Sequence, residues 1–152
     1  IPVVVAAQLV DVPSLVTPLE RFGGVLVFLE HYWGNQLGDP PYERIAPVLE
    51  LARFPNLYLR IVSNSSYAAR EGAGSPHAFF SLLAERFGTD RLVWGSNYPG
   101  HWDKHGSVGE RLTLAREDLA FLGDAAAKKI FGETALRFWP SGPGALSARK
   151  AT

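Results

Sequence analysis

Four short apolar runs recur along the chain, and each ends in polar or small residues before a stretch with helical signals. They lie at 1–8 (IPVVVAAQ), 25–30 (VLVFLE), 57–62 (LYLRIV) and 92–94 (LVW). Near-continuous apolar runs of this length are typical of strands that are buried on both faces of a parallel sheet. The alternation of such strands with helices predicts an α/β fold built around a parallel sheet.

The segments between the runs carry the helix signals. In 42–54, apolar residues recur at the spacing of one helix face. Ser75 can cap a helix that begins at Pro76 and ends before Gly88. Further helices are expected over 14–22, 110–122, 125–131 and 133–139, the last of which should dock Leu136, Phe138 and Trp139 onto the fold.

Two closed architectures use strand and helix units in this order. A doubly wound four-stranded sheet would be complete as it stands, although the sequence has neither glycine-rich phosphate motif, GxGxxG or GxxxxGK[ST]. A (β/α)8 TIM barrel would need further units, and the bare edges of the first and last strands would have to pair with the missing half. The chain has no methionine and opens inside an apolar run, so we expect a longer protein.

Composition narrows the classes of partner. Basic and acidic residues number 15 each, so no net charge attracts nucleic acid or an acidic membrane. No segment approaches the roughly 20 apolar residues that span a bilayer. The absence of cysteine excludes disulfides and thiolate metal sites and favours a cytoplasmic location. We therefore expect a globular protein that acts on a small-molecule substrate.

The stretch 91–103 (RLVWGSNYPGHWD) places a polar side chain at the end of a buried strand. Pro99 and Gly100 prevent the strand from continuing, so Asn97 is held where the chain leaves the sheet. In open α/β sheets and TIM barrels, ligands bind at the carboxyl ends of the strands. Besides Asn97, the polar residues at strand ends are Gln8, His31 and Asn64. Each of these residues either contacts a substrate or only satisfies backbone groups where its strand ends.

Several segments together resemble the amidohydrolase-related family of metal-dependent hydrolases and decarboxylases. LVWGSNYPG, followed at a distance by KKIFGETALRFW, is similar to the last strand and closing segment of that family. VLVFLEHYWG is similar to its sixth strand and NLYLRIVSNSS to its seventh. The resemblance implies a (β/α)8 TIM barrel, of which residues 1–139 cover roughly strands five to eight and the C-terminal helices, with 140–152 as a flexible tail. It also implies a missing N-terminal half as partner, and a homo-oligomer.

The resemblance also implies where a site would lie. The family builds its site from an HxH pair on strand one, His residues near the ends of strands five and six, and an Asp on strand eight. His31 matches the strand-six His and would be a catalytic residue or a metal ligand. At the end of the first run stands Gln8 and no His. Asn97 occupies the place of the usual Asp, and the HxH pair is not in this sequence.

The replacement of Asp by Asn changes the chemistry that the resemblance implies. A strand-end Asp can ligate a divalent cation and take a proton from metal-bound water. The amide of Asn97 cannot take a proton at neutral pH, so it could orient water or substrate but not act as the general base. Two alternatives follow, a site that holds zinc or manganese and a site that works without metal.

Three functions are compatible with these residues. We expect a hydrolase that cleaves a C–O or C–N bond of a small organic acid, lactone or amide, with Asn97 as a catalytic residue and His31 as the alternative base. The first alternative is a non-oxidative decarboxylase of an aromatic acid, which the family architecture supports. The second is a catalytically silent barrel that serves as a binding or assembly subunit.

Aromatic and histidine residues near the strand ends have two interpretations. Trp33, Tyr98 and Trp102 either line an apolar pocket for the substrate or cap the barrel core. His101 is a further candidate for substrate binding. His101 and His105 have the spacing of a metal-binding pair on one helix face, but the glycines that flank them favour a solvated loop.

Overall fold

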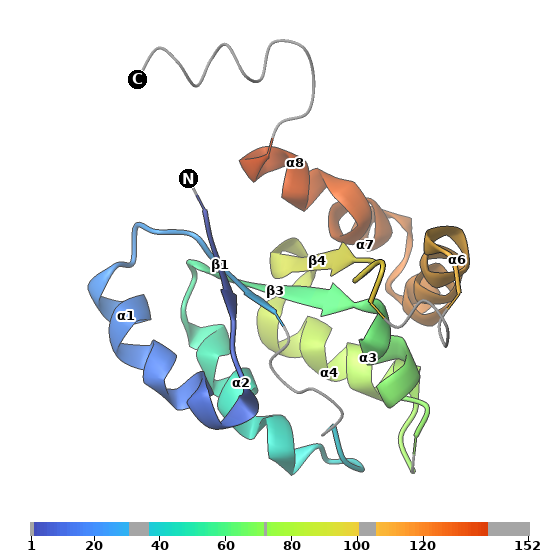
Figure 1. The fold of residues 1–152 in the computed structure, drawn as a ribbon, viewed down its shortest axis with the longest axis horizontal. Helices are drawn as coiled ribbons and strands as arrows, with labels where there is room; N and C mark the ends of the chain where they lie inside the picture. Colours follow the sequence, from blue (N-terminus) through green and yellow to red (C-terminus); the bar gives the residue numbers. More distant parts are fainter. Residues whose placement is uncertain (1, 31–36, 72, 101–105, 140–152) are drawn as a thin grey trace.

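Four parallel strands form one sheet at the centre of the fold, in a computed structural model that describes residues 2–30, 37–71, 73–100 and 106–139 (Figure 1). The strands are β1 (Val3–Ala6), β2 (Val27–Glu30), β3 (Leu57–Val62) and β4 (Leu92–Gly95). Each lies where an apolar run predicted it, and the predicted α/β class is confirmed. β1 is shorter than the predicted run, because the chain enters a 3-10 helix at Leu9–Leu15.

The order of the strands distinguishes between the two architectures that the sequence left open. The sheet runs β1-β2-β3-β4, and each neighbouring pair is parallel. Leu59 of β3 pairs with Leu29 on one side and with Leu92 on the other. A doubly wound sheet reverses its strand order at a switch point, and the described strands show no reversal. The sheet is therefore wound in one direction, as the wall of a barrel is.

Helices connect the strands and continue after the last one (Figure 1). The α-helices are α1 (Val16–Arg21), α2 (Ala46–Glu50), α3 (Ser63–Ala68), α4 (Pro76–Phe87), α6 (Val108–Leu119), α7 (Asp124–Lys128) and α8 (Thr134–Phe138). Other 3-10 helices lie at Glu43–Ile45, Leu51–Arg53, Thr89–Arg91 and Ala120–Leu122, and a π-helical turn lies at Lys129–Glu133. Within the described ranges, no helix has the length and apolar character needed to cross a membrane.

The two longest of these helices, α4 and α6, start at residues that cap them. The Ser75 hydroxyl accepts a hydrogen bond from the Ala78 amide at 3.1 Å, which confirms the predicted start of α4. Gly88, with a φ of 72°, follows the end of α4. Ahead of α6, Ser107 and Glu110 form a reciprocal capping box. This box explains why α6 begins before the predicted residue.

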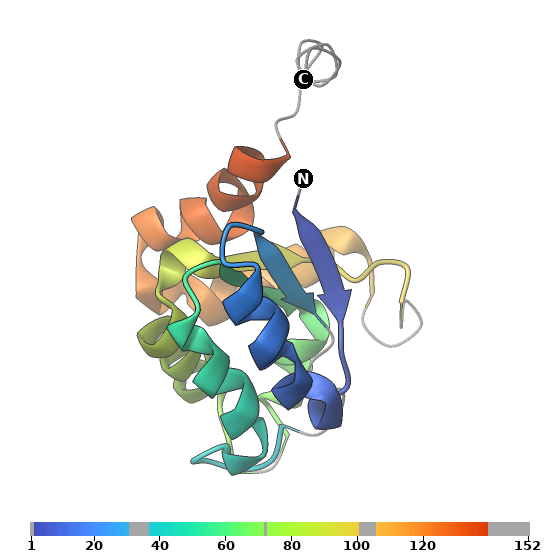
Figure 2. The same ribbon diagram turned by 90° about the vertical axis from the view of Figure 1, so that its left-hand side faces the viewer.

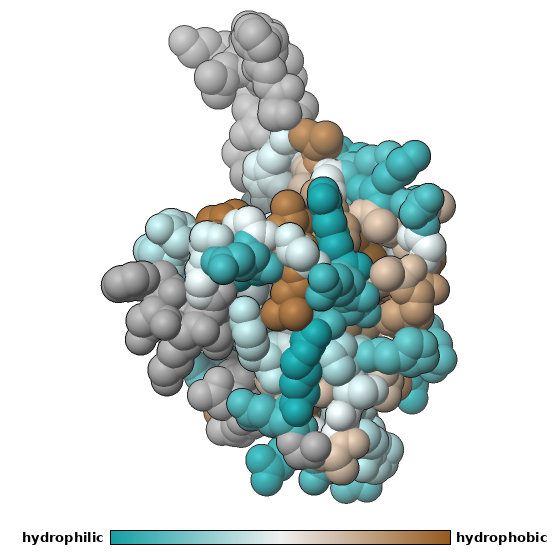
Figure 3. All heavy atoms as spheres, turned by 90° about the vertical axis from the view of Figure 1, so that its right-hand side faces the viewer, coloured by the Kyte–Doolittle hydropathy of each residue, from teal (hydrophilic) through white to brown (hydrophobic). Residues whose placement is uncertain are grey.

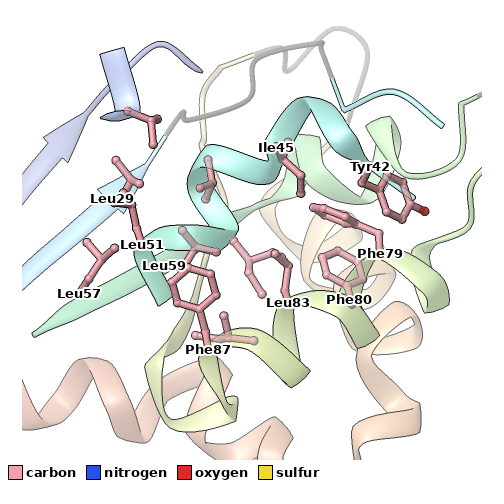
Figure 4. Packing of buried hydrophobic residues seen from close by; sticks show 14 of the residues in the cluster. Leu29, Tyr42, Ile45, Leu51, Leu57, Leu59, Phe79, Phe80, Leu83 and Phe87 are labelled. Carbon is pink, nitrogen blue, oxygen red and sulfur yellow. The ribbon is translucent and has the colours of Figure 1, made fainter. Parts of the chain in front are cut away.

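One face of the sheet packs against helices and forms the main hydrophobic core (Figure 4). Figure 2 shows α1 and α2 together on one side of the sheet. Alternate strand residues point to this side, because successive side chains of a strand face opposite ways. The members of this cluster that are 0% exposed include Leu29, Ile45, Leu57, Leu59, Phe79, Phe80 and Leu83.

The other face of the sheet carries a smaller aromatic cluster. Phe28 of β2 stacks on Tyr58 of β3 with ring centroids 5.1 Å apart, and Phe138 of α8 meets Tyr58 at 4.9 Å. Trp139 also contacts Phe28, at 4.6 Å between ring centroids. The prediction that Leu136 docks is wrong, since it is 49% exposed. Leu136 precedes Phe138 by two residues, so the two side chains point about 200° apart around the helix.

A short helix, α3, directly follows β3, where the sequence predicted only polar strand-end residues. Its sequence, SNSSYA, consists mostly of residues with modest helix propensity. Ser63, Ser65 and Ser66 are nevertheless buried. The Ser63 hydroxyl donates a hydrogen bond to the Ser96 carbonyl, and the Ser66 carbonyl accepts one from Arg70 at 2.7 Å. Tertiary contacts therefore outweigh local propensity in this segment.

Candidate functional site

The carboxyl ends of the strands lie at one edge of the sheet, because all of the strands are parallel. Glu30 ends β2, Ser63 follows β3, and Ser96 and Asn97 follow β4. Figure 3 views the molecule from the side to which the arrows of β3 and β4 point in Figure 1. Hydrophobic residues gather near the middle of that view, between hydrophilic ones.

An ion pair joins Glu30 of β2 to Arg60 of β3 near this edge. Arg60 stands between Leu59 and Ile61, which belong to the helix-covered core, so its side chain faces the other side of the sheet. Its Nη1 donates a hydrogen bond to Oε2 of Glu30. The two side chains are 36% and 14% exposed. The pair thus lies on the face that a closed barrel would turn inward, and ligand can reach part of it.

Gly95 at the end of β4 makes room for the Arg60 guanidinium. A Cβ atom at Gly95 would lie 2.8 Å from Nη2 and 3.0 Å from Cζ of Arg60. Real Cβ atoms do not approach other groups so closely, so Arg60 occupies space that only a glycine leaves open. Within the described residues, Nε and Nη2 of Arg60 make no hydrogen bond. Two donors of the guanidinium therefore stay available for a ligand.

Asn97 follows β4 in a left-handed backbone conformation, with a φ of 51°. Asparagine tolerates this region better than most residues that carry a side chain. The Ser96 hydroxyl accepts a hydrogen bond from the Tyr98 amide at 3.2 Å. A Cβ atom at Gly100 would lie 2.8 Å from the Asn97 carbonyl oxygen, so the turn is closely packed. The backbone of Asn97 is held tightly, and its side chain is half-buried.

Arg111 of α6 supports the same turn from behind. It is 0% exposed, and its Nη1 donates to the Ser96 carbonyl at 3.0 Å and to the Asn97 carbonyl at 3.4 Å. Its Nε donates to the Gly106 carbonyl at 3.1 Å. Its Cζ lies 5.8 Å from the centroid of the Tyr98 ring. A buried positive charge thus stands next to the end of β4.

A comparison with known protein families shows to which family this chain belongs. A family model described as amidohydrolase matches residues 1–141. The chain belongs to the amidohydrolase family. No curated protein matches it. The resemblance seen in the sequence is therefore confirmed.

Solved structures show the same fold. An amidohydrolase from Burkholderia multivorans with bound zinc aligns with a TM-score of 0.68 at 20% identity, over 88% of this chain and 51% of that one. A putative 2-pyrone-4,6-dicarboxylic acid hydrolase from Pseudomonas putida aligns at 0.67 and 19%, over 90% and 50%. An amidohydrolase 2 from Bifidobacterium longum subsp. infantis aligns at 0.62 and 16%, over 90% and 48%. The chain thus spans about half the length of these amidohydrolases and has the fold of about half of their barrels.

Four of the predicted site residues of this amidohydrolase chain can be placed. Gln8 is exposed at the start of the 3-10 helix after β1, and its side chain does not cap that helix. Asn64 lies in the first turn of α3, with a buried Oδ1 that has no hydrogen-bond partner. Tyr98 is 56% exposed. These residues share one edge of the sheet with Asn97, but no hydrogen bond joins their side chains to one another within the described ranges.

The remaining predicted residues lie outside the described residues. They are His31, Trp33, His101 and Trp102, together with His105 of the proposed histidine pair. Their roles stay predictions. The interpretation of 140–152 as a flexible tail also falls outside the described ranges.

The structure places three further residues at this edge that the sequence did not predict as site residues. Arg60 is the single charged residue in the run LYLRIV, and strand alternation could have placed it on the face opposite the leucines. For Glu30, the sequence predicts only the end of a strand. Arg111 carries no local signal, because it is 14 residues after Asn97 in the sequence and reaches the turn through folding.

The described residues by themselves do not fit a metal ion. They contain no group of three His, Cys, Asp or Glu side chains that could hold one. The amide oxygen of Asn97 is a neutral ligand, weaker than a carboxylate for zinc. Ligands for zinc or manganese would have to come from residues outside the described ranges, such as His31, and from outside this chain.

Proposed function

We propose that this chain supplies roughly strands five to eight of an amidohydrolase barrel that hydrolyses a C–O or C–N bond of a small organic acid, lactone or amide. Family membership over residues 1–141 supports the reaction class. The observation that carries the substrate class is the Arg60 guanidinium. Glu30 holds it at the carboxyl edge, and its Nε and Nη2 have no partner among the described residues. Guanidinium donors match the geometry of a carboxylate.

In this proposal, Arg60 anchors a carboxylate of the substrate at the floor of the site. The Pseudomonas putida neighbour is named for the hydrolysis of a dicarboxylic acid, which agrees with a substrate that carries negative charge. Additional contacts to the substrate would come from residues along the same edge. These are Gln8, Asn64 and Tyr98, with Trp33, His101 and Trp102 from segments outside the described ranges.

The chemistry follows from the groups near Asn97. Water adds to the carbonyl carbon of the lactone or amide, the C–O or C–N bond breaks, and the leaving oxygen or nitrogen takes up a proton. Asn97 cannot accept the proton of the attacking water. We assign that proton to His31 and give the amide of Asn97 the task of orienting the water or the substrate carbonyl. No step of this proposed reaction depends on a metal.

Carboxylated substrates and their uncharged counterparts give the direct test. The full-length protein, purified without chelator, is incubated with carboxylated lactones and amides and with the methyl esters of the same compounds. Ring opening or amide cleavage is followed by absorbance and NMR, and release of CO2 is measured in parallel. We expect hydrolysis of a carboxylated substrate. Release of CO2 without hydrolysis would identify a decarboxylase, and no turnover of either kind would favour a silent binding subunit.

Arg60→Gln tests the substrate class. Removing a charged hydrogen-bonding partner costs about 1.5–3 kcal/mol, so kcat/KM for the carboxylated substrate should fall by about tenfold or more. The value for the methyl ester should change little. Arg86→Gln is the matched control, because Arg86 is exposed on α4 and lies away from the carboxyl edge. An equal loss for both substrates would contradict the role of Arg60 in binding the carboxylate.

A further inference from the structure

Arg111 is buried completely, which is unusual for an arginine. It is 0% exposed, although arginine is almost never fully buried unless it is paired. Its partners among the described residues are the carbonyl groups of Ser96, Asn97 and Gly106. Its Nη2 is buried and has no hydrogen-bond partner. No carboxylate of the described ranges forms an ion pair with it.

The carbonyls that Arg111 binds lie on both sides of the connection between β4 and α6. Ser96 and Asn97 stand at the start of this connection, and Gly106 stands just before the capping residue Ser107. One guanidinium therefore holds together two ends of a long connection. Burying a charge that only carbonyl dipoles compensate is costly. Stability alone is thus a poor explanation for an arginine here.

Ser96 and Asn97 share these contacts, with the shorter bond, 3.0 Å, to the Ser96 carbonyl and the longer one, 3.4 Å, to the Asn97 carbonyl. Gly100 packs against the Asn97 carbonyl from one direction, since a Cβ there would lie 2.8 Å from that oxygen. Arg111 donates to the same oxygen at 3.4 Å. The backbone of Asn97 also has a positive φ, 51°, a region that asparagine tolerates better than most residues. Arg111 and Gly100 together thus hold the backbone from which the Asn97 side chain projects.

We infer that Arg111 is a positioning residue for the reaction at this edge, and that it acts by fixing the backbone of Asn97. The inference rests on the proposed function, in which the amide of Asn97 orients the water or the substrate carbonyl. A displacement of about 1 Å at such a group can cost about a hundredfold in rate. Lysine cannot replace the arginine, because a single ammonium group does not reproduce the fixed fork of donors.

Arg91 provides a matched control at the opposite edge of the sheet. Its Nε donates to the Phe87 carbonyl at 2.9 Å and its Nη1 to the Phe54 carbonyl at 2.8 Å. It is thus another partly buried guanidinium that bridges carbonyl groups, but it stands before β4 and not after it. Replacing it tests the loss of such a bridge without touching Asn97.

The test compares Arg111→Lys and Arg91→Lys in the full-length protein. Measurements are kcat and KM, the urea midpoint of unfolding, and hydrogen–deuterium exchange of the peptide that covers 92–100. We expect Arg111→Lys to lower kcat by about tenfold or more, with KM changed by less than about twofold, and to speed exchange at 96–100. Arg91→Lys should lower the urea midpoint and leave kcat unchanged. A normal kcat in a folded Arg111→Lys variant would overturn the inference.

Two further measurements apply if Arg111→Lys does not fold or if the wild-type protein has no activity. If Arg111→Lys does not fold, Gly100→Ala displaces Asn97 from the other side and should give the same loss of kcat, whereas unchanged kcat overturns the inference. If the wild-type protein turns over no substrate, the proposed function fails. Hydrogen exchange then tests the structural step alone: faster exchange at 96–100 in Arg111→Lys but not in Arg91→Lys supports that Arg111 fixes the backbone of Asn97, and equal exchange overturns it.

Discussion

The guanidinium of Arg60 lies against the α-carbon of Gly95, across the boundary between β3 and β4. A Cβ atom on Gly95 would come within 3.0 Å of Cζ and 2.8 Å of Nη2. The contact links the middle of one strand to the end of the next, since Arg60 pairs with Val93, two residues before Gly95. A residue without a side chain thus determines where a cation lies in the candidate site.

Gly95→Ala should therefore affect both stability and substrate binding. The added methyl group would come within 3.0 Å of the guanidinium, so Arg60 has to move from its place beside Glu30. Because the flexible end of a side chain can move aside, the main cost is the lost hydrogen bond to Glu30, about 1 kcal/mol in the free energy of unfolding. We expect a lower urea midpoint and a raised KM for carboxylated substrates. Gly132→Ala is the control, since a Cβ there meets nothing within 4 Å; equal effects of the two changes would contradict the argument.

Asn97→Asp should increase the metal content of the full-length protein. A carboxylate is a stronger ligand for zinc than a neutral amide, and aspartate also tolerates the left-handed backbone at this position. We expect elemental analysis to find about one zinc or manganese per chain in the variant and less in the wild type. Asn97→Ala removes the oxygen and serves as the control.

Each result of that comparison has a definite meaning. Metal in the wild type at about one ion per chain would show that the amide tolerates it, and metal-activated water would become the leading mechanism. Metal in the aspartate variant alone would favour chemistry centred on His31. Metal in neither protein would contradict the argument that Asn97 is the residue that weakens metal binding.

The strands and their ends could be predicted from sequence because their signals are local. β3 was predicted at Leu57–Val62 and lies there, since a run of apolar residues between Asn56 and Ser63 has clear limits. The start of α4 was found for a similar reason, as Ser75 and Pro76 are a local cap signal. The family motif around Asn97 also located the end of the last strand.

The remaining parts of the candidate site depend on contacts between distant residues. α3 was missed because its serines have weak helix propensity and become helical through partners such as Ser96. The pair Glu30 and Arg60 is separated by 30 residues and meets only when β2 and β3 align. Arg111 reaches the turn from another helix. A local sequence pattern cannot show which distant residues come into contact, so these contacts are known only from the folded structure.

Asn56→Ala should destabilise the fold by about 1–3 kcal/mol, because it removes a buried donor. Asn56 is 5% exposed, and its Nδ2 donates to the Val25 carbonyl at 3.0 Å and to the Phe22 carbonyl at 3.3 Å. The side chain thus ties the connection between α1 and β2 to the start of β3. Urea unfolding measures the effect. Ser14→Ala is the control, since it removes an exposed hydrogen bond to the Asp11 carbonyl and should change the free energy of unfolding by less than about 0.5 kcal/mol.

Glu110 gives a prediction for the dependence of stability on pH. Its Oε2 accepts hydrogen bonds from the amide and the hydroxyl of Ser107, both at 2.7 Å, and the bond from the amide is the main cause that lowers the pKa of Glu110. Because the folded pKa lies below that of the unfolded chain, about 4.3, the unfolded state binds the proton more readily. The stabilisation is therefore complete above that value and is lost as the pH falls through the lowered pKa.

The measurement is the urea midpoint of the wild type and of Glu110→Gln between about pH 7 and pH 3. Glutamine keeps the oxygen that accepts both bonds but does not titrate, so the wild type should lose stability relative to the variant only at the acidic end. Glu85→Gln is the control, because the side chain of Glu85, exposed on α4, makes no hydrogen bond or ion pair with the described residues. A constant difference between wild type and Glu110→Gln over the whole range would show that protonation of Glu110 does not weaken the start of α6.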